Sequence, residues 1–230
     1  FYSAILIDAG NAPQQSFFAS TEDIATFCQR MDAAGSNTYF ALSTFNTRFS
    51  RKQDNVKLTK ALFLDIDCAP EKVGQTDSDG STIPDKGYAT QKDGLKALLE
   101  FLVATGMPKP MVVSSGRGLH VYWVLDTALP QHEWQPLADA LKSTYQAGGF
   151  VFDPAVTADS ARVLRPIGTH NPKNGAEVKL LMDAPAYSSA ALQNVLGSVS
   201  PASSLGAPGS PPAGTARPAR SSLSAALSTT

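Results

Sequence analysis

The sequence predicts a mixed α/β fold, in which a sheet carries three short polar motifs and helices pack on its outer face. Two patterns lead to this prediction. Residues 62–66 and 119–125 alternate between two faces, as side chains do along a strand. Residues 90–105 and 130–147 instead place apolar side chains three or four positions apart, which is the spacing of a helix. Hydrophobic residues make up 43% of the 230 residues, enough for a substantial core.

The first predicted elements are a strand, a helix and a second strand. Residues 4–7 form a short apolar run. Residues 20–23 resemble a helix N-terminal cap, and apolar side chains recur at helical spacing from there up to Gly35. Residues 38–45 alternate between two faces throughout, which predicts one continuous strand.

The next strand ends in a pair of carboxylates. Phe63, Asp65 and Asp67 share one face of residues 62–67, and three aliphatic side chains share the other. Two carboxylates one pleat apart can bind the same divalent cation or bridge two, and without a cation their repulsion raises a pKa. A structural explanation stays open, because a polar turn follows and Asp is common at strand ends. Asp is nevertheless depleted inside strands, which favours a metal site.

A polar segment and a helix separate this motif from the next one. Residues 74–87 are polar and predict a mobile insertion. In the helix at residues 90–105, Gly106 provides the stop. The apolar stripe predicted for its buried face consists of Leu95, Leu98, Leu99 and Leu102.

The second motif is a glycine-rich turn between two strands. Residues 111–125 read as strand, turn and strand, with Ser115, Arg117 and Gly118 in the turn and His120 at the start of the second strand. Backbone N–H groups, hydroxyls, a guanidinium and an imidazole are the donors that phosphate oxygens accept from. The alternative is an ordinary hairpin with a half-buried histidine.

A helix and a third carboxylate follow. The predicted buried positions of the helix at residues 130–147 are Trp134, Leu137, Leu141 and Tyr145. Asp153 comes directly after the apolar triplet at residues 150–152, in a strand-like setting, although Asp-Pro also opens turns. Arg162 and Arg165 are three positions apart, which is one turn if the stretch is helical. They can neutralise phosphates or form surface ion pairs with Asp153 or Asp159.

The C-terminal part predicts a strand at residues 177–182, a short helix at residues 188–196 and then a change of character. From Ser198 onward, Ser, Ala, Pro and Gly dominate and no acidic residue is present. Such a composition buries too little surface to offset the entropy of ordering. We therefore expect one catalytic domain at residues 1–197 and a disordered linker or tail at residues 198–230.

The motifs have a fixed order: two carboxylates, a glycine-rich histidine segment and a third carboxylate. Metal-dependent nucleotidyl transfer needs acids that hold Mg²⁺ or Mn²⁺ and donors that hold a triphosphate. In this order, Asp-Ile-Asp, Ser-Gly-Arg-Gly-Leu-His and Val-Phe-Asp, followed by Arg-Val-Leu-Arg-Pro-Ile-Gly-Thr-His-Asn-Pro-Lys, resemble the catalytic motifs of the archaeo-eukaryotic primase superfamily. The most similar branch is the primase-polymerase type of phages, plasmids and other mobile elements, and the resemblance covers about residues 62–181.

The resemblance implies a primase-polymerase core with an RRM-like sheet, a DNA template, NTP or dNTP substrates, and a fused or associated helicase. It implies that Asp65, Asp67 and Asp153 bind the catalytic Mg²⁺ or Mn²⁺. It implies that His120, with Arg117, Ser115 and the adjacent Gly118, contacts the nucleotide phosphates, and that Arg162 and Arg165 lie near the nucleotide or template. A zinc-binding stem of some relatives is not carried over, because the chain has only two cysteines.

Two alternatives to a primase remain. A replication-initiator nicking enzyme would need a His-x-His metal pair, and the three histidines supply none. A non-catalytic nucleotide- or DNA-binding module of the same fold is the stronger alternative, although all three acids and the histidine are present.

Composition excludes some classes of protein. No apolar run has the length of a membrane span, no secretory signal is visible, and two distant cysteines fit a reducing cytoplasm. The net charge of −1 is not that of a protein that coats DNA. Contact with a template would therefore depend on local basic clusters, unless these are merely solvated. The clearest such cluster comprises Arg48, Arg51, Lys52, Lys57 and Lys60.

Overall fold

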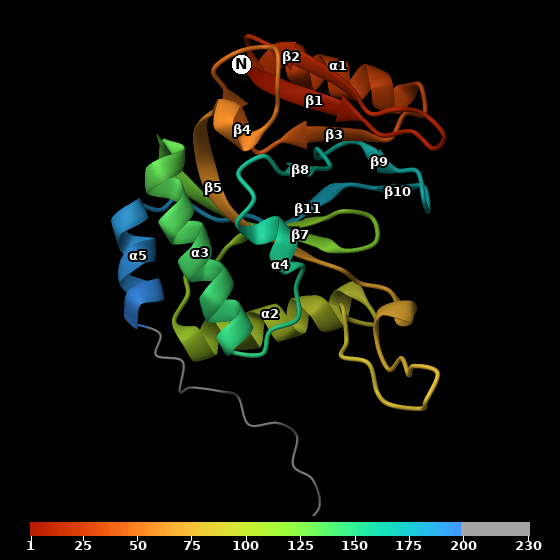
Figure 1. Cartoon of the computed structure of the whole chain (residues 1–230), viewed down its shortest axis with the longest axis vertical. Helices are drawn as coiled ribbons and strands as arrows, with labels where there is room; N and C mark the ends of the chain where they lie inside the picture. The colour runs from red at the N-terminus through yellow and green to blue at the C-terminus, as the bar shows by residue number, and fades with distance from the viewer. Residues whose placement is uncertain (199–230) are drawn as a thin grey trace, which may run out of the picture.

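The computed structural model describes residues 1–198 and consists of two antiparallel sheets with helices (Figure 1). The smaller sheet has the strand order β2-β1-β3-β8, and the larger one has the order β11-β6-β7-β5-β4. This arrangement confirms the predicted mixed fold. The smaller sheet comprises β1 (Tyr2–Leu6), β2 (Gln14–Phe18), β3 (Thr38–Ala41) and β8 (Val163–Leu164). The larger comprises β4 (Ser43–Phe45), β5 (Val56–Ile66), β6 (Met111–Ser114), β7 (Leu119–Leu129) and β11 (Lys179–Met182).

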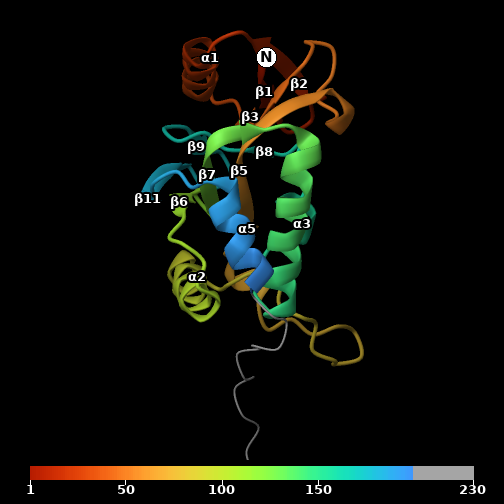
Figure 2. The ribbon, with the colours of Figure 1, turned by 90° about the vertical axis from the view of Figure 1, so that its left-hand side faces the viewer.

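Each sheet packs against its own helices. The smaller sheet is covered by α1 (Thr21–Ala33), and the larger one by α2 (Gln91–Thr105), α3 (Gln131–Ala147) and α5 (Ser189–Ser198), as Figures 1 and 2 show. The short helix α4 (Pro154–Thr157) lies beside β5. A small ladder joins β9 (His170–Asn171) to β10 (Ala176–Glu177), and two 3₁₀ turns span Gln53–Asn55 and Pro70–Lys72.

The register of the larger sheet confirms the two faces expected for its central strands. Asp65 pairs with His120, and Phe63 with Tyr122, so these side chains share one face. The opposite face contributes Leu62, Leu64, Ile66, Val121 and Trp123 to the main core, where α2, α3 and α5 cover them. The face that carries Asp65 and His120 also contributes Phe63 and Tyr122 to the main core, and Phe63 stacks on Trp134 of α3 with ring centres 5.7 Å apart.

Helix boundaries follow their predicted caps. The Ser20 hydroxyl accepts a hydrogen bond from the Asp23 N–H at 3.1 Å, and Thr90 caps α2 in the same way. Gly106 ends α2 with a φ of +69°. All four predicted positions of α3 are buried, but Leu99 of α2 is 43% exposed, so that side chain was wrongly assigned to the core.

Two further expectations were wrong, and a condition left open by the sequence is not met. Residues 38–45 are two strands in different sheets, and the break at Leu42 is stabilised by a hydrogen bond from its N–H to the Arg162 carbonyl. Residues 150–152 are not a strand, although the Asp153 N–H donates to the Asp65 carbonyl at 2.9 Å. The spacing of Arg162 and Arg165 would have been one turn only in a helix, and the stretch between them is instead the extended strand β8. In all three cases the deciding contact is made by a distant segment.

The segment between β5 and α2 is largely irregular and exposed, and its predicted mobility stays a prediction. The predicted tail, apart from Ser198 at the end of α5, lies outside the described residues. Within residues 1–198, no helix combines the length and apolarity that crossing a membrane requires.

Candidate active site

Asp65 lies at the centre of the candidate site, on the face of β5 that it shares with Phe63 and opposite His120 of β7. The pKa of the Asp65 carboxyl is raised to about 7, first by burial and then by the negative charges of Asp67 and Asp153. The positive charges of Arg162 and Arg165 act in the opposite direction. Acidic and basic residues from three separate segments thus converge on one carboxyl. Such like-charge crowding is costly unless a cation relieves it.

Asp67 is held at the end of β5 by two close backbone approaches and an ion pair. A Cβ at Gly87 would lie 2.4 Å from the Asp67 carbonyl oxygen, and one at Gly118 would lie 3.5 Å from the Asp67 Cα. Its carboxylate pairs with the Lys72 ammonium at 2.7 Å, with side-chain exposures of 48% for Asp67 and 35% for Lys72. A lysine therefore balances this carboxylate in the structure.

Asp153 reaches the site from a loop rather than a strand. Its backbone is hydrogen-bonded to Asp65, and its carboxylate caps α4 by accepting from the Ala155 N–H at 2.9 Å. The same carboxylate lies 3.8 Å from the guanidinium of Arg162. The ion pair considered for Arg162 from the sequence is therefore present at the candidate site.

The glycine-rich turn is built by hydrogen bonds within itself and by a neighbouring segment. The Ser115 hydroxyl accepts from the Gly118 N–H at 3.0 Å, and Gly116 adopts a φ of +90°. The buried Asn171 amide donates to the Ser115 carbonyl at 2.9 Å, and Asn174 donates to the Gly116 carbonyl at 2.9 Å. The Asn-Pro-Lys-Asn segment thus fixes the shape of this turn.

Arg117 forms its ion pair with an acid other than Asp65, Asp67 and Asp153. Its guanidinium pairs with Glu71 in the segment after β5, and both side chains are largely exposed. Together with the pair between Lys72 and Asp67, this contact connects the β5–α2 segment to both the first and the second motif.

His120 is buried beside Asp65, with only 3% of its surface exposed. Within residues 1–198, its Nδ1 atom has no hydrogen-bond partner. Burial, together with the smaller effect of the nearby Arg165 and Arg162, lowers the pKa of the ring to about 3. A neutral ring holds a phosphate only through a hydrogen bond, so most of the positive charge for a triphosphate must come from other residues.

We expect the His120 ring to remain neutral between pH 5 and 8. Two-dimensional ¹H–¹⁵N spectra of the imidazole nitrogens should show His170 titrating above its usual range, because the hydrogen bond to Asp32 raises its pKa, and His120 not titrating at all. Since the unfolded chain gains a proton on His120 that the folded chain excludes, this residue also lowers stability as the pH falls below about 6.5. Titration of His120 near pH 6.5 would contradict this environment.

Arg162 and Arg165 lie on either side of β8 and connect the two sheets. The Arg165 guanidinium donates to the Tyr39 hydroxyl at 2.6 Å and to the Asn37 side-chain oxygen at 2.9 Å. Arg162 faces Asp153, as described above. The two-residue strand between them pairs with β3, so docking of this strand positions both guanidinium groups.

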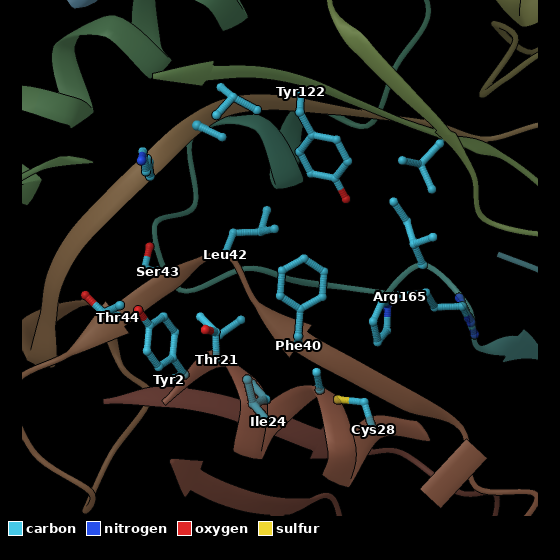
Figure 3. Close-up of a pocket in the computed structure, with 18 of the residues that line it drawn as sticks. Tyr2, Thr21, Ile24, Cys28, Phe40, Leu42, Ser43, Thr44, Tyr122 and Arg165 are labelled. Carbon is cyan, nitrogen blue, oxygen red and sulfur yellow. The ribbon is translucent and has the colours of Figure 1, made fainter. Parts of the chain in front are cut away.

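A cavity of about 620 Å³ separates the two sheets next to these residues (Figure 3). One wall comes from α1 and β3, including Cys28 and Phe40, and the other from β5, β6 and β7. Figure 3 shows Tyr122 pointing into the cavity from β7 towards Phe40 and Leu42, with Arg165 at one end. Burial and, after it, the negative charge of Asp65 raise the pKa of the Tyr122 hydroxyl, so Asp65 lies near the wall of this cavity.

The carboxylates of Asp65, Asp67 and Asp153 are suitable ligands for a divalent metal, although the described residues do not form a preorganised metal site. Carboxylate oxygens are the ligands that Mg²⁺ and Mn²⁺ prefer, and the raised pKa of Asp65 reports crowded negative charge that a cation would relieve. Among residues 1–198, no three acidic, histidine or cysteine side chains are grouped as metal ligands would be. Asp67 and Asp153 face Lys72 and Arg162 instead.

Sequence reasoning did not identify Lys72 or Asn171 as part of this site. Lys72 follows Asp67 by five positions and Pro70 by two, which is a weak signal for a returning turn. Asn171 lies in the Gly-Thr-His-Asn-Pro-Lys stretch, whose pattern was noted without a physical role. In the structure, the physical role of Asn171 is to hold the glycine-rich turn in place, because its buried side-chain amide donates to the Ser115 carbonyl.

Comparison with solved structures identifies the fold. The chain superposes on the AEP domain of the primase-polymerase (PrimPol) of cyanophage S-2L with a TM-score of 0.57 and 14% identity, over 85% of this chain and 88% of that one. It superposes on primase RepB′ with a TM-score of 0.52 and 15% identity, over 86% of this chain and 56% of that one. No protein-family model and no curated protein sequence matches the chain. The chain therefore has the fold of primase catalytic domains and spans about half the length of RepB′.

Proposed function

We propose that the chain performs template-directed nucleotidyl transfer, as a DNA primase or primase-polymerase domain in the replication of a phage, a plasmid or another mobile element. The fold shared with primase catalytic domains supports this proposal. The observation that carries it is the convergence on Asp65 of two further acids and two arginines from three segments of the chain. Carboxyls with such surroundings cluster at functional sites.

Asp65, Asp67 and Asp153 would hold two Mg²⁺ or Mn²⁺ ions in this proposal. When bound, such ions activate a 3′-hydroxyl and neutralise charge on the leaving pyrophosphate. The chain contributes the positions of the three carboxylates. Asp65 lies on a strand buried on both sides, and the backbone of Asp153 is hydrogen-bonded to Asp65, so these two acids cannot move apart independently.

The nucleotide phosphates would be held by groups around the acids. Arg162 and Arg165 are already positioned by Asp153, Tyr39 and β8, so their charges can offset that of a transition state without reorganisation. The Ser115 hydroxyl accepts from Gly118, which leaves its own hydrogen to donate to a phosphate oxygen. Lys72 would exchange its contact with Asp67 for a phosphate oxygen.

A nucleotide- or DNA-binding module without catalysis is the second candidate. The observation that favours it is the pairing of Asp67 with Lys72 and of Asp153 with Arg162, because these cations neutralise two of the three acids. In such a module the same arginines would bind phosphate, and the acids would only position them.

An incorporation assay separates the two candidates. The purified chain is incubated with labelled NTPs or dNTPs and a single-stranded template, with and without an annealed primer, in Mg²⁺, Mn²⁺ or EDTA. We expect products that require both the template and the metal, and products without a primer would identify priming. Nucleotide and template binding without any product would favour the non-catalytic module.

We expect His120→Ala to weaken nucleotide binding or turnover more than template binding. The Nδ1 atom of His120 is buried and lacks a partner within residues 1–198, which suits a group that waits for a ligand. Nucleotide titrations and template titrations of the same variant measure the two effects. His120→Gln, which retains a polar group, serves as a second variant if the alanine variant folds poorly.

His132→Ala is the matched control, because His132 is an exposed residue of α3. It should change neither titration. If His120→Ala melted several degrees lower while its nucleotide titration stayed unchanged, His120 would be a core histidine and its assignment to the phosphates would be wrong.

A further inference from the structure

The loop between β4 and β5 presents an aromatic side chain to solvent. Phe49 is 95% exposed, whereas the other large exposed apolar side chain of comparable exposure, Val103 at 85%, lies on α2. Figure 1 shows this loop (orange) projecting beside the N-terminal strands, away from the helices of the larger sheet. No core residue is supplied by residues 46–55, so packing does not explain a phenylalanine here.

The loop is held in shape by internal hydrogen bonds although it is exposed. The Asn55 side chain makes three hydrogen bonds to the backbone of the loop. Its oxygen accepts from the Thr47 N–H at 3.2 Å. Its NH₂ group donates to the Thr47 carbonyl at 3.1 Å and to the Ser50 carbonyl at 2.5 Å. The base of the loop is closed by the Asn46 N–H, which donates to the Asn55 carbonyl at 2.9 Å. A preorganised loop loses little entropy when its side chains bind a partner.

The loop is also connected to the candidate active site. Arg51 donates to the Ala161 carbonyl, and the Gln53 amide donates to Asp159 at 3.0 Å. Ala161 directly precedes Arg162, whose guanidinium faces Asp153. A ligand on this loop would therefore lie on a surface continuous with the segment that carries a site arginine.

The charge around Phe49 is positive in a chain whose net charge is −1. Between residues 46 and 60, one acidic residue, Asp54, stands against five basic ones: Arg48, Arg51, Lys52, Lys57 and Lys60. Lys60 lines the cavity between the two sheets, so the basic residues extend from the loop into that cavity. Arg48 and Lys52 precede and follow Phe49 in the loop, and both are exposed, with the Arg48 guanidinium 4.5 Å from the centre of the Phe1 ring.

We infer that the loop at residues 46–55 binds single-stranded nucleic acid, with Phe49 stacking on an unpaired base and Arg48 and Lys52 contacting phosphates. An exposed aromatic ring between cations fits this ligand, because every unpaired base offers a face for stacking and every nucleotide carries a negative charge. A paired base has no free face, so duplex DNA would contact the cations alone. The inference rests on the proposed function only in naming this strand as the template.

Fluorescence anisotropy with a labelled single-stranded oligonucleotide tests the inference. We expect Phe49→Ala to weaken binding by about 5- to 150-fold, the range for loss of one stacked base, and Phe49→Trp to retain it. Phe49→Leu, which is apolar but cannot stack in this way, should behave like the alanine variant. Duplex of the same sequence should bind wild type and Phe49→Ala equally.

The charge contribution is measured separately. Lys52→Gln should reduce the slope of log affinity against log salt by about 1, because one phosphate contact is lost. Val103→Ala and Lys96→Gln, both at exposed positions on α2, are the matched controls and should leave the affinity unchanged.

The inference and the proposed function fail in different ways. Single-stranded DNA bound equally by wild type and Phe49→Ala would overturn the inference, whether or not nucleotides are incorporated. Loss of binding in Phe49→Ala, in a chain that incorporates no nucleotide, would support the inference and contradict the proposed enzyme. A wild-type chain that binds no single-stranded DNA at low salt would overturn the inference outright.

Discussion

Asp65→Asn is expected to lower metal-dependent nucleotide incorporation by about 1000-fold or more. The substitution keeps the size of the side chain but removes the charge that would hold a divalent cation, and such a cation contributes several kcal/mol to the transition state. The measurement is the initial rate of incorporation on a primed template at saturating nucleotide. Raising the Mn²⁺ concentration should restore little activity, because the ligand itself is missing.

The same variant should be at least as stable as wild type in EDTA at pH 8. Asp65 has a pKa of about 7 in the folded chain, above its ordinary value, so the folded chain retains a proton that the unfolded chain loses. The stability of wild type therefore falls as the pH rises from about 4 to about 7, and the penalty remains above that range. Asparagine has no such penalty, and each 1 kcal/mol regained would raise the melting temperature by about 2–4 °C.

Asp126→Asn is the matched control for Asp65→Asn. Asp126 is an exposed residue of β7, and its carboxylate takes part in no ion pair with a residue described in the structure. The control should keep both activity and stability. Near-wild-type incorporation by a folded Asp65→Asn variant would contradict the assignment of Asp65 as a metal ligand. A strong loss of stability in this variant would show that the carboxylate has a structural role instead.

Much of the larger sheet could be predicted from local pattern. The alternation along residues 62–67 and 119–125 is strict, so the faces of Asp65 and His120 follow from the period of a strand. The caps of α1 and α2 depend on residues within one turn of the helix, so Ser20 and Gly106 could be read directly.

Features that depend on distant partners could not be predicted in this way. Residues 38–45 alternate without interruption, and only the hydrogen bond from Leu42 to Arg162 reveals that the chain changes sheets there. Asp153 resembles a strand residue in sequence because an apolar triplet precedes it, yet the Asp65 carbonyl and α4 determine its position. The contact between Lys72 and Asp67 depends on how an irregular segment folds back, which no periodicity encodes.

Gly118 illustrates how a motif residue can have a role that its sequence does not reveal. From the sequence, the glycine allows the backbone to approach a phosphate. In the structure, a Cβ at position 118 would lie only 2.4 Å from the Ile66 carbonyl oxygen, at the point where β5 and β7 pair. The glycine is therefore also required for the two strands that carry Asp65, Asp67 and His120 to meet.

Gly118→Ala should both destabilise the chain and reduce incorporation strongly. Neither backbone can yield easily, because Ile66 pairs with Leu119 and the Gly118 carbonyl accepts from the Ser115 N–H at 2.9 Å. Overpacking of this kind costs about 1–3 kcal/mol, which corresponds to a loss of about 2–12 °C in melting temperature. Activity should fall further than stability alone explains, since any separation of β5 from β7 moves the acids away from His120, and a small misplacement of reacting groups lowers the rate about 100-fold.

Gly197→Ala is the glycine-to-alanine control for this prediction. A Cβ there meets no atom of residues 1–198 within 4 Å, and the position lies in α5, where alanine favours the helix by about 1 kcal/mol over glycine. The control should therefore melt at the same temperature as wild type or slightly higher and incorporate nucleotides normally. If Gly118→Ala behaved like this control, β5 and β7 would accommodate an added methyl group where they pair. The close approach of Gly118 to Ile66 would then not be what positions the first motif against the second.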